Sequence, residues 1–141
     1  MSKFPIVLVE DDKDDCEFII NALSEIGVTN EIRCFASPIT AIEYLRNTSE
    51  IPFIIISDIN MPGMNGLAFK RFLNDDALLN AKRIPFVFLS TSAASYLVDE
   101  AFNLCVQGYF QKPTALNEYG NIAKAIIEYW KNSKLPHALN N

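Results

Sequence analysis

Short apolar runs alternate along the chain with longer segments whose apolar residues recur every three or four positions. The runs predict strands over residues 6–9, 31–35, 53–56, 84–89 and 107–111. The periodic segments predict helices over residues 14–26, 38–45, 67–73, 93–104 and 116–131. Strands and helices therefore alternate along nearly the whole sequence.

Two helix boundaries carry residues with known end preferences. Gly27 is expected to stop the first helix. Ser37 is the expected N-cap of the second helix, and Pro38 is its expected first residue. The apolar face of this second helix should consist of Ile39, Ala41, Ile42 and Leu45. The last helix should bury a stripe made of Leu116, Tyr119, Ala123, Ile126, Ile127 and Trp130.

Five strand–helix units in succession predict an α/β fold with one parallel sheet and helices on both faces. The simplest assembly is a flavodoxin-like, doubly wound, five-stranded sheet in the order 2-1-3-4-5. Residues 53–56 are the most hydrophobic strand, which suits the middle of such a sheet. We expect one domain over residues 1–132 and a polar tail over residues 133–141. Such sheets bind ligands beyond the carboxyl ends of strands 1 and 3.

Composition narrows the classes of function. The chain has 141 residues and a formal charge of −5, from 17 acidic and 12 basic residues, and it lacks a basic run. This argues against direct binding to nucleic acid. Three cysteines and a single histidine show no metal-ligand spacing, so a disulfide framework and a zinc site are not expected. No secretion signal or membrane-length apolar run is present, which predicts a cytoplasmic location without membrane contact.

Polar side chains follow four of the five predicted strands, where a parallel sheet brings the strand ends together. They are Glu10, Asp11 and Asp12 after strand 1, Asp58 after strand 3, Ser90 and Thr91 after strand 4, and Lys112 after strand 5. Aspartates gathered there repel one another unless a positive charge lies between them. Mg²⁺ prefers such oxygen ligands, and Lys112 adds a second positive charge.

A metal, an ammonium group and a hydroxyl around one aspartate are the groups needed to move a phosphoryl group onto a carboxylate. Asp58 would attack, while the metal, Lys112 and Ser90 hold the phosphoryl oxygens. Taken alone, Asp58 is more often a turn or a cap, and Asp11 and Asp12 are more often a solvated helix start. Their joint occurrence at successive strand ends favours the functional interpretation.

Four segments closely resemble response-regulator receiver domains. They are residues 7–12 (VLVEDD), 57–66 (SDINMPGMNG), 89–90 (LS) and 109–113 (YFQKP), and the match spans about residues 4–131. The resemblance implies that Asp58 takes a phosphoryl group from a histidine kinase or a histidine phosphotransfer protein. It implies that Asp11 and Asp12 hold Mg²⁺, with Asp12, Asp58 and the backbone carbonyl of Asn60 as direct ligands. Asp11 would act mostly through water.

The same resemblance assigns a conformational switch. Ser90 corresponds to the switch hydroxyl, Tyr109 to the switch aromatic and Lys112 to the family's lysine. Phosphorylation would reshape a face made of the fourth helix, the fifth strand and the last helix, which would bind a downstream protein or form a weak homodimer. The Lys112–Pro113 bond is often cis in this family. We expect a single-domain response regulator that catalyses only its own phosphorylation and dephosphorylation and is not a turnover enzyme.

Two departures from the family pattern stand out. Position 91, beside the switch hydroxyl, usually holds alanine or glycine, and here it is Thr91. Residues 77–83 also lengthen the link before the fourth strand, as in stand-alone receivers that serve phytochrome-like kinases.

Other functions are less consistent with these residues. A phosphorylation-independent interaction module would not need the acids, the hydroxyl and the lysine. A phosphatase with an aspartyl-phosphate intermediate needs Asp-x-Asp after strand 1, and a flavin site would not place acids there. About ten residues follow the last helix, so direct transcriptional control is not expected unless the chain is a piece of a longer protein.

Overall fold

The sheet has the predicted strands and the predicted order. A computed structural model describes residues 4–134. Its five parallel strands are β1 (Ile6–Val9), β2 (Ile32–Phe35), β3 (Ile54–Ser57), β4 (Phe86–Ser90) and β5 (Gly108–Gln111). They pair in the order β2-β1-β3-β4-β5. The α/β fold with a flavodoxin-like sheet is confirmed.

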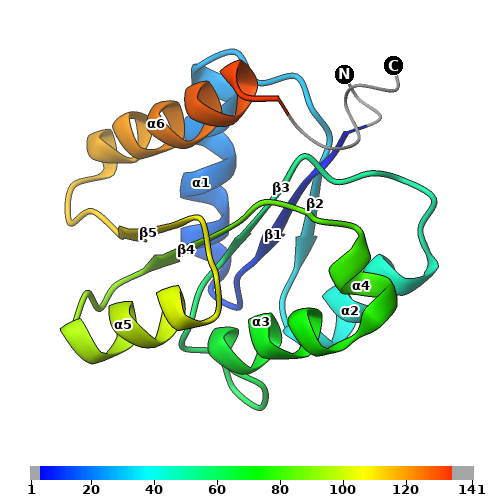
Figure 1. Ribbon diagram of the computed structural model, residues 1–141. Helices are drawn as coiled ribbons and strands as arrows, with labels where there is room; N and C mark the ends of the chain where they lie inside the picture. The colour runs from blue at the N-terminus through cyan, green and yellow to red at the C-terminus, as the bar shows by residue number, and fades with distance from the viewer. Residues whose placement is uncertain (1–3, 135–141) are drawn as a thin grey trace.

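The helices cover both faces of this sheet. They are α1 (Lys13–Glu25), α2 (Pro38–Asn47), α3 (Gly66–Asp75), α4 (Ala77–Ala81), α5 (Ser95–Asn103) and α6 (Tyr119–Asn132), with a 3₁₀ turn over Leu116–Glu118. α1 and α6 pack on one face, and α2 to α5 lie on the other (Figure 1). Ser37 caps α2 as predicted, since its side chain accepts a hydrogen bond from the N–H of Thr40.

Side chains alternate between the two faces along β1. Ile6 and Leu8 join the core beneath α1 and α6, while Val7 and Val9 join the core beneath the other helices. All four residues are buried, as period-2 alternation requires of a strand covered on both sides. The two cores hold the strand ends in place, and the polar residues project from those ends.

Two predictions on the elements were wrong. Ile39 is 53% exposed and Leu116 is 62% exposed, so neither belongs to the buried face of its helix. Leu116 lies in the 3₁₀ turn that precedes α6, where the α-helical period has not yet begun. The lengthened link before β4 contains a short helix, α4, whose Leu79 is buried and whose N-cap is Asp76. Most of the expected tail, residues 135–141, lies outside the described residues.

Candidate functional site

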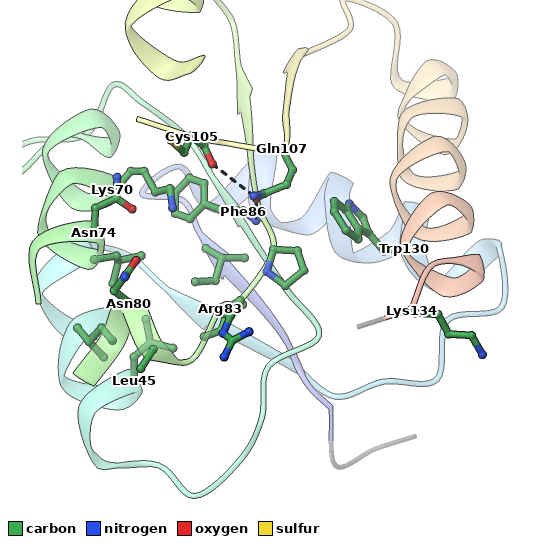
Figure 2. A pocket seen from close by; sticks show the side chains of 16 residues that line it. Leu45, Lys70, Asn74, Asn80, Arg83, Phe86, Cys105, Gln107, Trp130 and Lys134 are labelled. Atoms are coloured by element: carbon green, nitrogen blue, oxygen red, sulfur yellow. Dashed lines mark hydrogen bonds between the residues drawn. The ribbon is translucent and has the colours of Figure 1, made fainter. Parts of the chain in front are cut away.

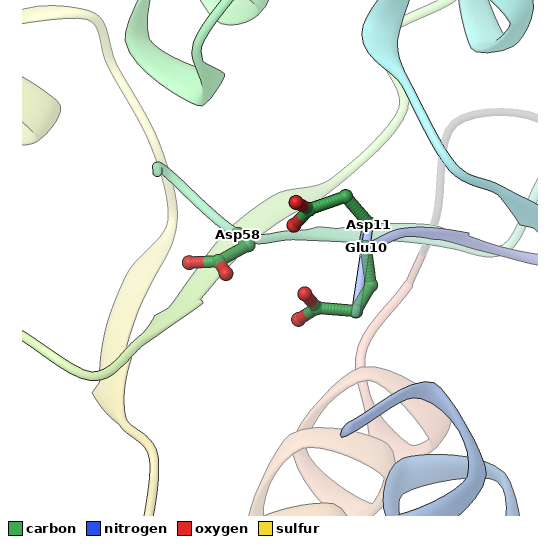
Figure 3. A group of neighbouring side chains, drawn as sticks. All are labelled: Glu10, Asp11 and Asp58. Carbon is green, nitrogen blue, oxygen red and sulfur yellow. The ribbon is translucent and has the colours of Figure 1, made fainter. Parts of the chain in front are cut away.

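The site begins where β1 and β3 end side by side. Val9 is paired with Ser57, and the N–H of Asp58 donates to the carbonyl of Val9 at 3.0 Å. Glu10 and Asp58 therefore leave the sheet at the same level. One carboxylate oxygen from each of Glu10, Asp11 and Asp58 lies within 4.8 Å of the other two. Figure 3 shows the carboxylates of Glu10 and Asp11 directed toward that of Asp58.

Lys112 joins this acidic group from β5. Its Nζ lies 2.7 Å from Oε1 of Glu10 and 3.0 Å from Oδ2 of Asp58. All three side chains are buried, so their charges interact through a medium of low polarity. Asp11, by contrast, is exposed at the rim. The buried ammonium thus stabilises two buried carboxylates that would otherwise repel each other.

A fourth acid, Asp15, also binds Lys112. Oδ2 of Asp15 lies 2.7 Å from Nζ of Lys112, so the three N–H donors of the ammonium face three different carboxylates. Asp15 lies in the first turn of α1, which the sequence presents as one more acid of a solvated helix start. The sequence analysis missed it because its partner is 97 residues away along the chain.

The buried charges have shifted pKa values. Burial is the main cause that raises the pKa of Glu10 to about 7, and the charge of Asp58 adds to it, while Lys112 opposes it. For Lys112, burial lowers the pKa, but its hydrogen bonds with Asp15, Glu10 and Asp58 outweigh burial and raise it above the usual value. Lys112 is therefore an ammonium ion at neutral pH.

Asp12, expected as a direct metal ligand, has another role in the structure. Its Oδ1 accepts hydrogen bonds from the N–H groups of Asp14 and Asp15 at 2.9 and 3.1 Å, so it is the N-cap of α1. The acids that meet Asp58 are Glu10 and Asp11, one residue earlier than expected. Val9 is paired with Ser57, so the next residues along the two strands, Glu10 and Asp58, lie beside each other.

The loop after Asp58 packs tightly against it. The N–H of Ile59 donates to Oδ1 of Asp58 at 2.7 Å, and the N–H of Gly66 donates to the carbonyl of Ile59 at 2.8 Å. A Cβ at position 66 would lie 2.1 Å from the carbonyl oxygen of Asp58, which only glycine avoids. Gly66 thus packs against the backbone of Asp58, while the N–H of Ile59 orients its carboxylate.

Ser90 and Tyr109 lie beside this group. Ser90 is fully buried, and its Oγ has no hydrogen-bond partner among the described residues. Its carbonyl accepts from the N–H of Lys112 at 2.7 Å. The Tyr109 hydroxyl donates to the carbonyl of Ser92 at 2.5 Å, and its ring packs against Phe88. Tyr109 is thus tied to the segment that follows β4, and Ser90 is the last residue of β4 itself.

Three further expectations have different outcomes. Thr91 is exposed, and its carbonyl accepts from the side chain of Gln111 at 3.1 Å. Asn60 is exposed on the loop after Asp58, and the role of its carbonyl as a ligand stays a prediction. The expected cis bond before Pro113 is absent, since no peptide bond in the described residues is cis.

A separate cavity of about 510 Å³ lies at the opposite end of the sheet. It opens near the first residues of β4, and its lining includes Lys70, Phe86 and Cys105 (Figure 2). It shares no residue with the acidic group. The acidic group and Lys112 therefore lie at the carboxyl ends of the strands, away from this cavity.

The donor set suits a hard divalent cation. Three carboxylates converge, and Lys112 contacts two of them, those of Glu10 and Asp58. Oxygen ligands alone, without histidine or cysteine, are typical of Mg²⁺, Ca²⁺ and Mn²⁺ sites. The fold, the acidic group and the buried lysine together are consistent with a phosphoacceptor site at a strand end.

The chain belongs to the response regulator receiver domain family, whose model matches residues 6–124. It is thus a receiver domain of two-component signalling and not a turnover enzyme. None of the helices within residues 4–134 is long and apolar enough to cross a membrane.

Relatives of known class agree with this membership. The chemotaxis protein CheY of Pseudomonas aeruginosa is 31% identical over 108 residues, which cover 77% of this chain and 83% of CheY. The phosphorylated cyanobacterial phytochrome response regulator RcpA is 34% identical with a TM-score of 0.84, covering 94% of this chain and 98% of RcpA. The Mn²⁺-bound form of response regulator Rcp1 is 26% identical with a TM-score of 0.82, covering 94% and 99% of the two chains.

Proposed function

We propose that this chain accepts a phosphoryl group on Asp58 and works as a single-domain response regulator of a two-component phosphorelay. The observation that carries the proposal is the buried contact of 3.0 Å between Lys112 and Asp58, inside a group of carboxylates that suits a divalent cation. A structural aspartate at a strand end would need neither the ammonium nor its neighbouring acids.

The donor is a phosphohistidine of a sensor histidine kinase or of a histidine phosphotransfer protein. A carboxylate oxygen of Asp58 attacks the phosphorus, an O–P bond forms, and the N–P bond to the donor imidazole breaks. The N–H of Ile59 holds Oδ1 of Asp58 in place, and Lys112 lies beside Oδ2. The ammonium is positioned to stabilise charge on the phosphoryl oxygens.

Glu10, Asp11 and Asp58 are the side chains that would hold Mg²⁺, with the carbonyl of Asn60 as a further oxygen ligand. When bound, the cation supplies positive charge to the phosphoryl oxygens. The structure of Rcp1 with Mn²⁺ supports a divalent cation in this family. Asp12 is no longer proposed as a ligand, since its carboxylate caps α1.

The response to phosphorylation starts at Ser90. A phosphoryl oxygen on Asp58 can accept a hydrogen bond from the buried hydroxyl of Ser90. When Ser90 moves toward it, the segment after β4 moves as well. Tyr109 is bonded to the carbonyl of Ser92 in that segment, so the movement reaches β5. We propose that the surface of α5, β5 and α6, where Tyr96 and Tyr129 are exposed, binds the downstream protein or a second copy in a weak homodimer. The site of action is the cytoplasm.

Acetyl phosphate or phosphoramidate with Mg²⁺, followed by intact mass measurement, tests the proposal. We expect one phosphoryl adduct on the wild-type chain and none on Asp58→Asn. Asp12→Asn is the matched control, and it should keep the adduct because its carboxylate lies outside the acidic group. An unmodified wild-type chain with both donors would instead favour a phosphorylation-independent interaction module.

A further inference from the structure

Two cysteines that are distant in the sequence touch in the fold. Cys16 lies in the first turns of α1, and Cys34 lies in β2. Their Sγ atoms are 3.3 Å apart, although 18 positions separate the residues. Neither thiol takes part in the proposed phosphoryl chemistry.

The sheet register explains this contact. Cys34 is paired with Leu8 of β1, so both side chains project to the same face of the sheet. Leu8 belongs to the core beneath α1, and Cys16 packs against that core. Cys34 therefore faces α1 from the edge strand, where its side chain stays exposed. The contact is a product of the fold and not of chance surface proximity.

The two thiols have different surroundings. Cys34 is exposed, whereas Cys16 is half-buried and its S–H donates to Sγ of Cys34. Burial is the main cause that raises the pKa of Cys16 to about 12, and the hydrogen bond with Cys34 adds to it. Cys16 is thus a protonated thiol at neutral pH, while Cys34 is the sulfur that a dissolved oxidant meets.

We propose that Cys16 and Cys34 form a reversible modification site, which a hydroperoxide converts into an intramolecular disulfide. A disulfide bond is about 2.05 Å long, so the two sulfurs must approach by roughly 1.2 Å. Rotation of the exposed Cys34 side chain contributes to this approach, since Cys34 lies at the sheet edge. The proposal concerns a site that the phosphorelay does not use.

The chemistry proceeds in two steps. The Cys34 sulfur attacks one oxygen of the hydroperoxide, the O–O bond breaks, and a sulfenic acid forms with release of water or an alcohol. The Cys16 sulfur then attacks the Cys34 sulfur, the S–O bond breaks, and the Cys16 proton leaves with the hydroxyl as water. Two thiols are oxidised and one peroxide is reduced. A dithiol reductant reverses the product by thiol–disulfide exchange.

Oxidation of the full chain with dilute hydrogen peroxide tests the site. After quenching, the remaining thiols are alkylated in denaturant and the product is measured by intact mass and peptide mapping. We expect one alkylated thiol, Cys105, and a link between Cys16 and Cys34. Treatment with dithiothreitol before alkylation should restore three alkylated thiols.

Single substitutions separate this site from random oxidation. Cys105→Ser should form the link, whereas Cys16→Ser and Cys34→Ser should not. Asp58→Asn should form it as readily as the wild type, so the result is independent of phosphorylation. Three free thiols after oxidation, a link that includes Cys105, or Cys34 oxidised to sulfinic acid without a link would each overturn the proposal.

The link should also stabilise the fold, because it closes a loop in the unfolded chain. We expect the oxidised wild type to melt several degrees above the reduced form, by roughly 3–8 °C. Cys34→Ser should melt at the same temperature after either treatment. A lower melting temperature for the linked chain would mean that the disulfide distorts the fold. It would overturn the proposal that the native structure accommodates this bond.

Discussion

At the scale of single residues, Lys112 is the centre of the site. Its ammonium contacts Glu10, Asp15 and Asp58, and no direction is left in which it can bind a further group without releasing a partner. Phosphorylation of Asp58 would therefore redistribute the hydrogen bonds of Lys112. Asp15 is the partner at the rim, since its side chain is the most exposed of the three.

Asp15→Asn should prolong the phosphorylated state. Without the carboxylate of Asp15, Lys112 interacts more fully with the phosphoryl group. The gain corresponds to a partly exposed ion pair, so hydrolysis of the adduct should slow by about two- to fivefold. The measurement is the decay of the phosphorylated mass after removal of the donor. Asp14→Asn is the control, since Asp14 is an exposed acid in the same turn. Equal decay in both variants would remove Asp15 from this role.

Glu10 should give the metal-free chain a characteristic pH dependence. Its pKa of about 7 exceeds the usual 4.5, so protonated Glu10 favours the folded state. This contribution is complete below about pH 4.5 and is lost as the pH rises through about 7. In EDTA, the free energy of unfolding by urea should fall between pH 5 and pH 8 by about 2–3 kcal/mol more in the wild type than in Glu10→Gln. If the free energy of unfolding changed equally with pH in both proteins, Glu10 would not be the source of this dependence.

At the scale of elements, α3 begins directly against the backbone of Asp58. Its first residue, Gly66, packs against the backbone of Asp58, so the helix start and the strand end form one rigid corner. A side chain there must push α3 away from β3. The loop between them is anchored in the core as well, because Ile59 and Met61 are buried.

Gly66→Ala should therefore destabilise the chain by at least about 2 kcal/mol, because the new Cβ meets backbone that cannot move aside. It should also slow phosphorylation of Asp58. Gly120→Ala in α6 is the matched control, since nothing lies within 4 Å of a Cβ there, and it should be neutral or stabilising by up to about 1 kcal/mol. Urea unfolding of both variants measures the difference. Similar urea midpoints for the two variants would show that α3 can shift away from Asp58 at little cost in stability.

The sequence predicted most of these elements, because alternation and period are local properties. Its prediction for Ile39 was wrong, since this residue fits the helical period of apolar residues in α2 but is exposed in its first turn. It also failed for α4, since five residues are too few to show a helical period. For the site, the structure brings Asp11, Asp58 and Lys112 together at the strand ends where the sequence placed them, and their roles stay predictions. It does not bring Asp12 into this group, since its carboxylate caps α1. The contact of Asp15 with Lys112 depends on the path of α1, which only tertiary structure provides.

At the scale of the whole molecule, the sheet separates two environments. The carboxyl ends of the strands gather the acidic group, while the amino ends surround the cavity near Lys70. The acidic group forms only when the whole sheet is folded. A cation that binds it therefore raises the free energy of unfolding of the domain, so global unfolding reports on cation binding.

Mg²⁺ should raise the melting temperature of the chain relative to an equal ionic strength of KCl, because it binds the folded state and offsets repulsion among three carboxylates. Asp11→Asn should lose most of this increase. Asp12→Asn should keep it while the baseline stability falls by up to about 1 kcal/mol, because the substitution removes a negative charge from the N-terminus of α1. Differential scanning fluorimetry measures both effects. A larger loss of the Mg²⁺ effect in Asp12→Asn would return Asp12 to the metal site.

The buried hydroxyl of Ser90 has a consequence for how the domain divides its free energy between two states. A buried hydroxyl without a partner costs about 1–3 kcal/mol, and this cost falls on the unphosphorylated form alone if a phosphoryl oxygen satisfies it later. In that case the unphosphorylated domain lacks one hydrogen bond that the phosphorylated domain has. The free energy of this bond then favours the phosphorylated conformation of the segment after β4.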